Sequence, residues 1–128
     1  MRVILEGMNN PDMQQFAIEI ARIASDNKSE DVTTMDLRGL SQVTDYVVIC
    51  TGTSDRQIRS VADHMLEYGK EVGERVYSVS GYTNATWILV DFIDVVVHIF
   101  AKQYREYYDL ELLWGDAPKV HWVRSESA

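Results

Sequence analysis

Two predicted strands in the second half of the chain, residues 86–91 and 94–100, carry large apolar side chains on both of their faces. A tight turn at Phe92 and Ile93 would join them into a hairpin. Side chains alternate between two faces along a strand, so each face of the hairpin can be listed from the sequence. A small domain covers one face of a sheet with its own helices more easily than two. The second face therefore needs another cover, either a helix of the same chain or a binding partner.

The predicted register gives the two faces a different chemical character. Asp91 lies opposite Asp94, Leu89 opposite Val96, and Trp87 opposite His98, and these six residues share one face. The other face is aliphatic throughout and carries Ile88, Val90, Val95, Val97 and Ile99. We expect the aliphatic face to pack on the core. The mixed face, with an aromatic anchor and carboxylates, is typical of a protein-binding surface, while cover by the chain's own helix remains the alternative. A register slip of one residue would exchange the two faces.

The composition describes one globular domain with an acidic balance. The chain has 128 residues, 46% hydrophobic and 25% charged, with a net charge of −8. This charge disfavours broad binding to a nucleic-acid backbone, and it suits either a basic protein partner or solubility alone. The single cysteine, Cys50, lies in an apolar run, which predicts a buried thiol and a reducing, cytoplasmic compartment. No stretch is long enough for a signal-peptide core or a membrane span.

The periodicity predicts eight elements in the order α-β-β-α-β-β-β-α. Asn10 and Pro11 resemble a helix N-cap and a first-turn proline, and Ser54 with Gln57 has the spacing of a capping box. We assign residues 1–10 to an N-terminal segment, 11–118 to a single domain and 119–128 to a flexible tail. The fold class is α/β with α+β character: a mixed sheet of about five strands with helices packed on it.

Candidate catalytic chemistry is sparse. Residues 51–54, Thr-Gly-Thr-Ser, connect a strand to a helix, where helix amides can bind an anion and where nucleotidyltransferase active sites begin. Such an enzyme needs clustered carboxylates nearby for magnesium, and Asp91 with Asp94 is the nearest well-placed pair. Those two carboxylates also suit a hairpin turn, and the loop also suits a simple helix cap. The three histidines show no metal-ligand spacing, so we predict no catalytic residue, metal or cofactor.

Three motifs resemble one known family. They are DLRGLSQVTDYVVICTGTSDRQIRSVADH, W-x-x-x-D-x-x-DVVVHIF and REYYDLELLWGDAP, and together they span about residues 16–118. In order, spacing and content they are similar to the Iojap family of ribosomal silencing factors (RsfS). The resemblance implies a fold like that of nucleotidyltransferases, without their catalytic carboxylate pattern.

The resemblance also implies a function. Family members bind the large ribosomal subunit through large-subunit ribosomal protein fourteen and sterically block subunit joining, which represses translation under nutrient limitation. The implied contact residues here are Trp87, Leu89, Asp91, Asp94, Val96 and His98, helped by Arg56 and Tyr108. Little direct nucleic-acid contact, no membrane contact and a possible homodimer off the ribosome complete this expectation. A nucleotide-binding enzyme of the nucleotidyltransferase class is the alternative.

The chain departs from the family pattern at one position. The family commonly has glycine just before the second Asp of the hairpin, and this chain has Ile93. A turn that requires a positive φ would be strained by a β-branched residue. The departure therefore bears on the geometry of the turn and not on the family resemblance.

Overall fold

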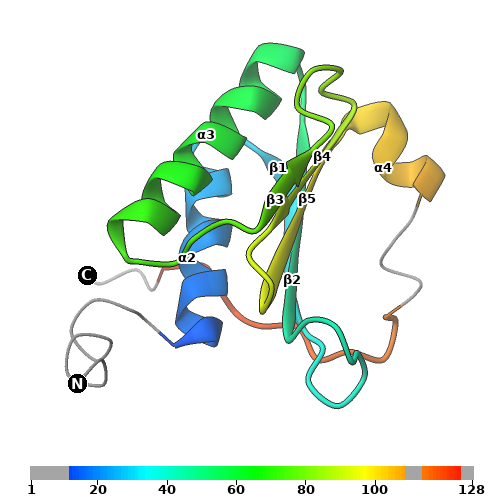
Figure 1. The fold of residues 1–128 in the computed structure, drawn as a ribbon. Coiled ribbons are helices and arrows are strands. Elements are labelled where there is room, and N and C mark those ends of the chain that lie inside the picture. Colours follow the sequence, from blue (N-terminus) through cyan, green and yellow to red (C-terminus); the bar gives the residue numbers. More distant parts are fainter. Residues whose placement is uncertain (1–11, 109–113, 125–128) are drawn as a thin grey trace.

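The computed structural model describes residues 12–108 and 114–124, with the side chains of residues 106–108 left out. The elements are α2 (Met13–Asp26), β1 (Glu30–Asp36), β2 (Tyr46–Gly52), α3 (Asp55–Glu71), β3 (Ser78–Ser80), β4 (Trp87–Asp91), β5 (Val95–Ala101) and α4 (Lys102–Tyr108). Their order confirms the predicted α-β-β-α-β-β-β-α arrangement. Figure 1 shows the sheet close to edge-on, with α2 and α3 on one side and α4 on the other.

The two long helices begin at side-chain caps. Ser54 is the N-cap of α3, as predicted, and its Oγ accepts a hydrogen bond from the amide of Gln57 at 3.1 Å. The N-cap of α2 is Asp12, whose Oδ1 accepts from the amide of Gln15 at 2.8 Å. The prediction of Asn10 as the cap was therefore wrong, because the carboxylate at residue 12 satisfies the first orphan amides of the helix.

The strands form one mixed sheet in the order β1-β2-β5-β4-β3. The central pair, β2 and β5, is parallel, and the other three pairs are antiparallel. This confirms the predicted fold class, while the likeness to nucleotidyltransferases stays a prediction. We call the side of the sheet under α2 and α3 the inner face and the opposite side the outer face.

The inner face holds the larger of two hydrophobic clusters. Phe16 of α2 stacks on Tyr68 of α3 at 5.6 Å between ring centroids and meets Phe92 edge-on at 4.9 Å. The aliphatic set predicted for the core side of the hairpin is fully buried in this cluster: Ile88, Val90, Val95, Val97 and Ile99. Cys50 is also fully buried there, and burial raises the pKa of its thiol to about 12. The predicted buried cysteine is confirmed.

The outer face is covered over β1, β2 and β5 by the C-terminal part of the chain. The second cluster contains Met35, Leu37, Val47, Ile49, Phe100 and Ala117, with Trp87, Tyr104 and Trp114 packed against it. Arg105 of α4 reaches across this side and donates from Nη1 to Thr51 Oγ1 at 2.8 Å. The cover is thus built from residues that follow β5 directly in sequence.

The segment after Pro118 closes the β1 edge and does not form a free tail as far as Arg124. Lys119 makes an antiparallel bridge with Met35. The Trp122 carbonyl accepts from Arg22 Nε at 2.8 Å, and Arg124 makes two hydrogen bonds with the carboxylate of Asp26, at 2.8 and 3.0 Å. The expectation of a flexible tail from residue 119 was therefore wrong for 119–124, because strand pairing and side-chain contacts anchor this stretch. Residues 125–128 lie outside the described part of the chain.

The hairpin turn lies one residue later than predicted. The register pairs Leu89 with His98 and Asp91 with Val96, so Ile93 and Asp94 are the two turn residues. Leu89 opposite Val96, Asp91 opposite Asp94 and Trp87 opposite His98 were wrong pairings. The slip amounts to two residues along one strand, an even number, so each side chain keeps its predicted face.

Ile93 occupies a strained conformation at this turn. Its φ is +76°, which only glycine adopts freely, and a β-branched residue is a clear outlier there. The amide of Asp94 bonds the carbonyl of Phe92 across it at 3.0 Å, as in a tight three-residue turn. The Asp91 carboxylate, which accepts from the Ile93 amide at 2.7 Å, helps to hold this geometry.

Replacing Ile93 by glycine is expected to stabilise the protein. The substitution removes a left-handed penalty of about 1–2 kcal/mol, less a smaller entropic cost in the unfolded chain, so we expect a net gain of about 1 kcal/mol. Urea unfolding followed by circular dichroism measures it. Ile93→Ala is the control, because it keeps the Cβ and the strain and should leave stability nearly unchanged. Glycine no more stable than alanine would contradict strain at this turn.

Candidate partner-binding surface

One part of the outer face is left without cover by the described residues. β4 and its neighbour β3 lie beyond the second cluster, and the residues of β4 and β5 that point outward here are only half-buried. We call this the open face and define it by Leu89, Asp91, Val96, Ser78 and Ser80. Leu89 is paired with Ser80 and Asp91 with Ser78, so two small side chains border the two larger ones. Leu89 and Val96 are therefore half-buried apolar side chains among small and polar neighbours.

An aromatic cluster borders the open face where the C-terminal cover ends. The Trp87 ring stacks on Phe100 at 5.0 Å and lies 5.8 Å from His98. Trp87 Nε1–H donates to His98 Nδ1 at 3.0 Å, which places the histidine proton on Nε2. Trp87 is therefore a half-buried side chain with its orientation set on two sides.

His98 is neutral in this cluster. Burial lowers its pKa from 6.5 to about 4, because a charged imidazolium would lose its hydration. A neutral Nδ1 can accept the Trp87 hydrogen bond, whereas a protonated one could not. His98 thus acts as a support for the tryptophan and offers little surface of its own, being 7% exposed.

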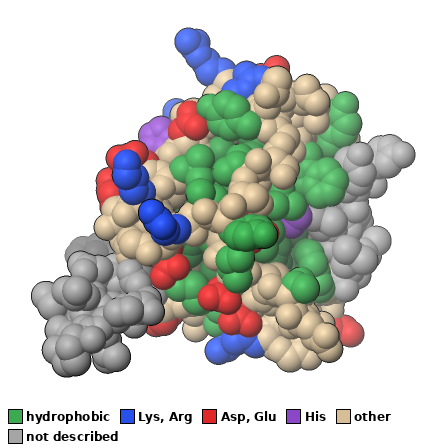
Figure 2. Space-filling view, viewed as in Figure 1, with side chains coloured by type: hydrophobic (Ala, Val, Ile, Leu, Met, Phe, Trp, Pro, Cys, Tyr) green, Lys and Arg blue, Asp and Glu red, His purple; other side chains and the backbone are tan. Residues whose placement is uncertain are grey.

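Carboxylates gather at the turn end of the open face. Asp94 is an exposed turn residue, and its carbonyl accepts from the amides of Asp45 and Tyr46 at 3.0 Å each. These bonds attach the turn to the start of β2. Figure 2 shows acidic side chains below the centre of the molecule, with a Lys or Arg side chain beneath them. The open face therefore ends at an exposed carboxylate, Asp94, whose backbone is held in place.

The structure brings together five of the eight predicted contact residues on one side of the sheet: Trp87, Leu89, Asp91, Val96 and His98. Asp94 follows them at the turn. Arg56 does not join them, because it is exposed in the first turn of α3, and α3 packs on the inner face. The side chain of Tyr108 lies outside the described residues. Sequence reasoning missed Phe100 as the ring that supports Trp87, and only the correct register would have revealed it.

The loop at residues 51–54 uses its polar groups internally. Gln57 Oε1 accepts from the amide and the hydroxyl of Thr53, at 2.6 and 3.0 Å, and Gln57 Nε2 donates to the carbonyl of Lys28 at 2.7 Å. Gly52 is needed for close packing, since a Cβ there would lie 2.4 Å from Ile58 Cγ1. These contacts favour the helix-cap interpretation of the loop.

The carboxylates of the nucleotidyltransferase alternative are badly placed for this loop. β2 and β5 are parallel, and Gly52 is level with Ala101 at one end of the sheet, whereas Tyr46 is level with Val95 at the other end, next to the hairpin turn. Asp94 lies at that second end, roughly 20 Å away at the rise of a parallel strand. Among the described residues, no three His, Cys, Asp or Glu side chains form a group that could hold a metal ion. No helix in that same part of the chain is both long and apolar enough to span a membrane.

The buried His98 predicts a pH-dependent stability difference. Its pKa is depressed in the folded state, so the unfolded chain takes up the proton first and stability falls as pH drops below 6.5. At pH 5.5 the loss should be about 1.4 kcal/mol relative to pH 7.5. His98→Asn retains an acceptor for Trp87 and lacks this titration, so its urea stability should fall by that much less over the same range. Parallel pH profiles for the two proteins would contradict a neutral His98.

Comparisons with known proteins identify a family. A family model described as "Ribosomal silencing factor during starvation", RsfS, matches residues 10–128. The Bacillus subtilis ribosomal silencing factor RsfS is 45% identical over 106 residues, which are 82% of this chain and 90% of that protein. The chloroplastic protein Iojap of Zea mays is 34% identical, over 91% of this chain and 50% of that protein.

Solved structures show the same fold. A crystal structure from Chromobacterium violaceum, protein CV0518, superposes with a TM-score of 0.79 at 30% identity and covers 90% of this chain and 95% of that one. A crystal structure from Bacillus halodurans gives a TM-score of 0.72 at 36% identity, over 84% of this chain and 98% of that one. The chain belongs to the RsfS family of ribosomal silencing factors.

Proposed function

We propose that this protein binds the large ribosomal subunit through large-subunit ribosomal protein fourteen, blocks subunit joining and so represses translation in the cytoplasm. Its membership of the silencing-factor family supports a regulatory role on the ribosome. The observation that carries the finer proposal is the open face, where the described residues leave the outward Leu89 and Val96 only half-buried. A partner protein is the cover that the described residues lack.

The open face has the chemical layout of a protein contact. Leu89 and Val96 supply apolar area in the centre, and Trp87 supplies an aromatic anchor whose orientation is already set. An anchor held in place before binding loses little side-chain entropy on association. These features fit a small interface with one tryptophan hot spot.

Charge sets the expected partner. Asp94 is exposed at the turn, and the whole chain carries a net charge of −8. A basic ribosomal protein would meet this end with opposite charge, and the overall field would accelerate the encounter at low salt. The same field opposes close approach to ribosomal RNA, which agrees with little direct nucleic-acid contact.

Arg56 and a possible homodimer fit this proposal only under added conditions. Arg56 lies on the α3 side of the sheet and would take part only if the partner wraps around the end of the sheet near Trp87. A homodimer off the ribosome would use the open face too, so dimer and ribosome complex would exclude each other. Steric exclusion of the small subunit then needs only that a 14.7 kDa domain occupies its contact surface.

Substitutions on the open face test this function. Leu89→Arg and Asp94→Arg should each weaken co-sedimentation with purified large subunits at least tenfold, by removing apolar area or by reversing charge at the contact. Both should also restore joining of large and small subunits in the presence of the factor, measured on sucrose gradients. Asp94 is the cleaner site, because no described residue bonds its side chain, whereas the Asp91 carboxylate supports the turn.

Glu67→Arg is the matched control for charge. It makes the same change as Asp94→Arg on the exposed side of α3, away from the outer face, and should leave both readouts unchanged. Equal losses in all three variants would indicate a general effect of charge. Undiminished binding by Leu89→Arg and Asp94→Arg would place the ribosome contact on another surface.

A further inference from the structure

A second surface lies on the inner side of the sheet, at the edge formed by β3. It is a pocket of about 410 Å³ between the end of α3 and the segment that leads into β3, lined by Leu66, Lys70, Glu74, Arg75 and Val76. A volume of this order is typical of small binding sites. The open face and the contacts of the proposed function do not include any of these five residues.

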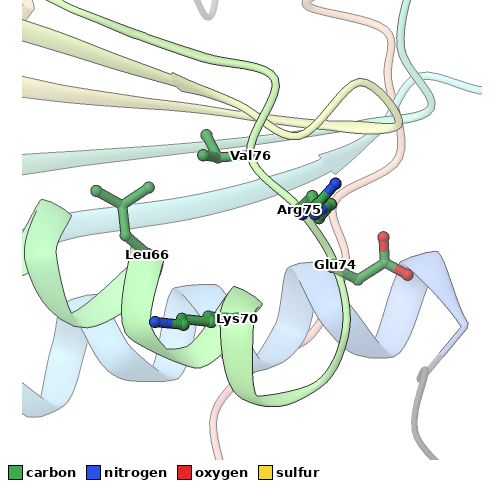
Figure 3. A pocket seen from close by; sticks show the side chains of 5 residues that line it. All are labelled: Leu66, Lys70, Glu74, Arg75 and Val76. Atoms are coloured by element: carbon green, nitrogen blue, oxygen red, sulfur yellow. The ribbon is translucent and has the colours of Figure 1, made fainter.

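Close backbone packing shapes the pocket. The amide of Glu74 bonds the carbonyl of Gly69 at 2.8 Å, so the chain turns back tightly over the end of α3. A Cβ added to Gly69 would lie 2.8 Å from the carbonyl oxygen of Glu74 and 2.8 Å from Phe92 Cε1. Only glycine at residue 69 lets the backbone of Glu74 pass this close to the end of α3. The chain that follows then places Val76 across the pocket from Leu66. Figure 3 shows Leu66 rising from α3 toward Val76, while the carboxylate of Glu74 points away from both.

The pocket combines an apolar interior with two cations, Lys70 and Arg75, and one carboxylate, Glu74. Leu66 is partly buried, and Val76 is 38% exposed, so apolar surface faces solvent here. Neither Lys70 nor Arg75 has an ion-pair partner within residues 12–108 and 114–124. A dipole effect at the end of α3 accounts for Lys70 but not for Arg75, which lies after the helix. Lys70 and Arg75 outnumber Glu74 among the lining residues, and on a chain of net charge −8 this local excess of positive charge is complementary to an acidic ligand.

The neighbouring strand, β3, favours a ligand in an extended conformation. β3 is the last strand of the sheet, and no described strand pairs with its outer edge. Its sequence, Ser-Val-Ser, has no charge or proline to block pairing. Exposed rings flank it, with Tyr77 at 72% and Tyr82 at 38%. An unpaired edge beside a pocket is the arrangement that binds an extended peptide, with backbone pairing along the edge and alternate side chains in the pocket.

We infer that the β3 edge and the adjoining pocket bind an extended acidic peptide segment of a partner protein. One apolar side chain enters between Leu66 and Val76, and carboxylates two residues before and after it meet Lys70 and Arg75. The spacing follows from the two-residue period of a strand, which points such side chains to one side. Because β3 has only three residues, side chains in the pocket supply more of the affinity than backbone pairing does.

A designed peptide tests this inference on the full chain. Fluorescein-labelled TETLTET places its leucine and both glutamates on one face, and fluorescence anisotropy should report saturable binding. TKTLTKT, with lysine for glutamate, and TETSTET, with serine for leucine, should each bind at least tenfold more weakly. A TETLTET peptide methylated on the leucine nitrogen should also bind more weakly, because it cannot pair with the edge.

Variants of the protein locate the contact. Lys70→Glu and Arg75→Glu should each weaken TETLTET binding at least tenfold, whereas Lys119→Glu, the same charge change at the opposite β1 edge, should not. Equal binding of the three unmethylated peptides, equal binding of the methylated peptide, or equal loss in Lys119→Glu would overturn the inference. Concentration-dependent dimerisation that Lys70→Glu abolishes, without peptide binding, would overturn it in favour of a second copy of the chain.

Discussion

The central constraint on this fold is that β2 is buried along its entire length, on both sides of the sheet. Tyr46, Val48 and Cys50 belong to the cluster under α2 and α3, while Val47 and Ile49 belong to the cluster on the outer face. A strand of this kind can exist only between two layers. In this 128-residue chain, α2 and α3 form the inner layer, and α4 with the segment that follows it forms the outer layer.

The inner layer needs little explanation beyond sequence pattern. α2 and α3 are amphipathic, and their buried positions recur at helical spacing, so local information was sufficient to predict them. The outer layer has a different origin. It consists of a short helix and an irregular segment that contacts β1 by one bridge, and no periodic pattern encodes it. The prediction of a flexible tail failed there because pairs such as Asp26 with Arg124 are separated by most of the chain.

The hairpin shows which errors a sequence argument tolerates. The predicted turn was one residue early and every cross-strand pair was wrong, yet the two faces were assigned correctly. The reason is parity, since each strand partner moved by two positions and side chains repeat every two. Residue propensities could not predict the turn itself. Ile93 has a φ of +76°, a conformation in which turns strongly favour glycine or asparagine. The position of Arg56 could not be predicted either. A motif gives spacing along the chain, but it does not say which side of the sheet a helix covers.

The limits of the outer layer also determine where partners can bind. Residues 118–124 are anchored to the β1 edge and to α2: Lys119 bridges Met35, Arg22 donates to the Trp122 carbonyl, and Arg124 donates to Asp26. Those contacts hold the end of the cover at the far side of the sheet from β3. Among the described residues, α4 packs on β5 and β2, and of the outward side chains of β4 and β3 only Trp87 lies against the second cluster. The contacts that close the β1 edge thus leave two exposed features at the β3 end of the sheet. Outside lies the open face with its carboxylates, and on the inner side, where Ile88 and Val90 are fully buried, lies the pocket with two cations and one carboxylate. Opposite charges on the two sides of one strand pair favour two chemically different partners over two copies of the same one.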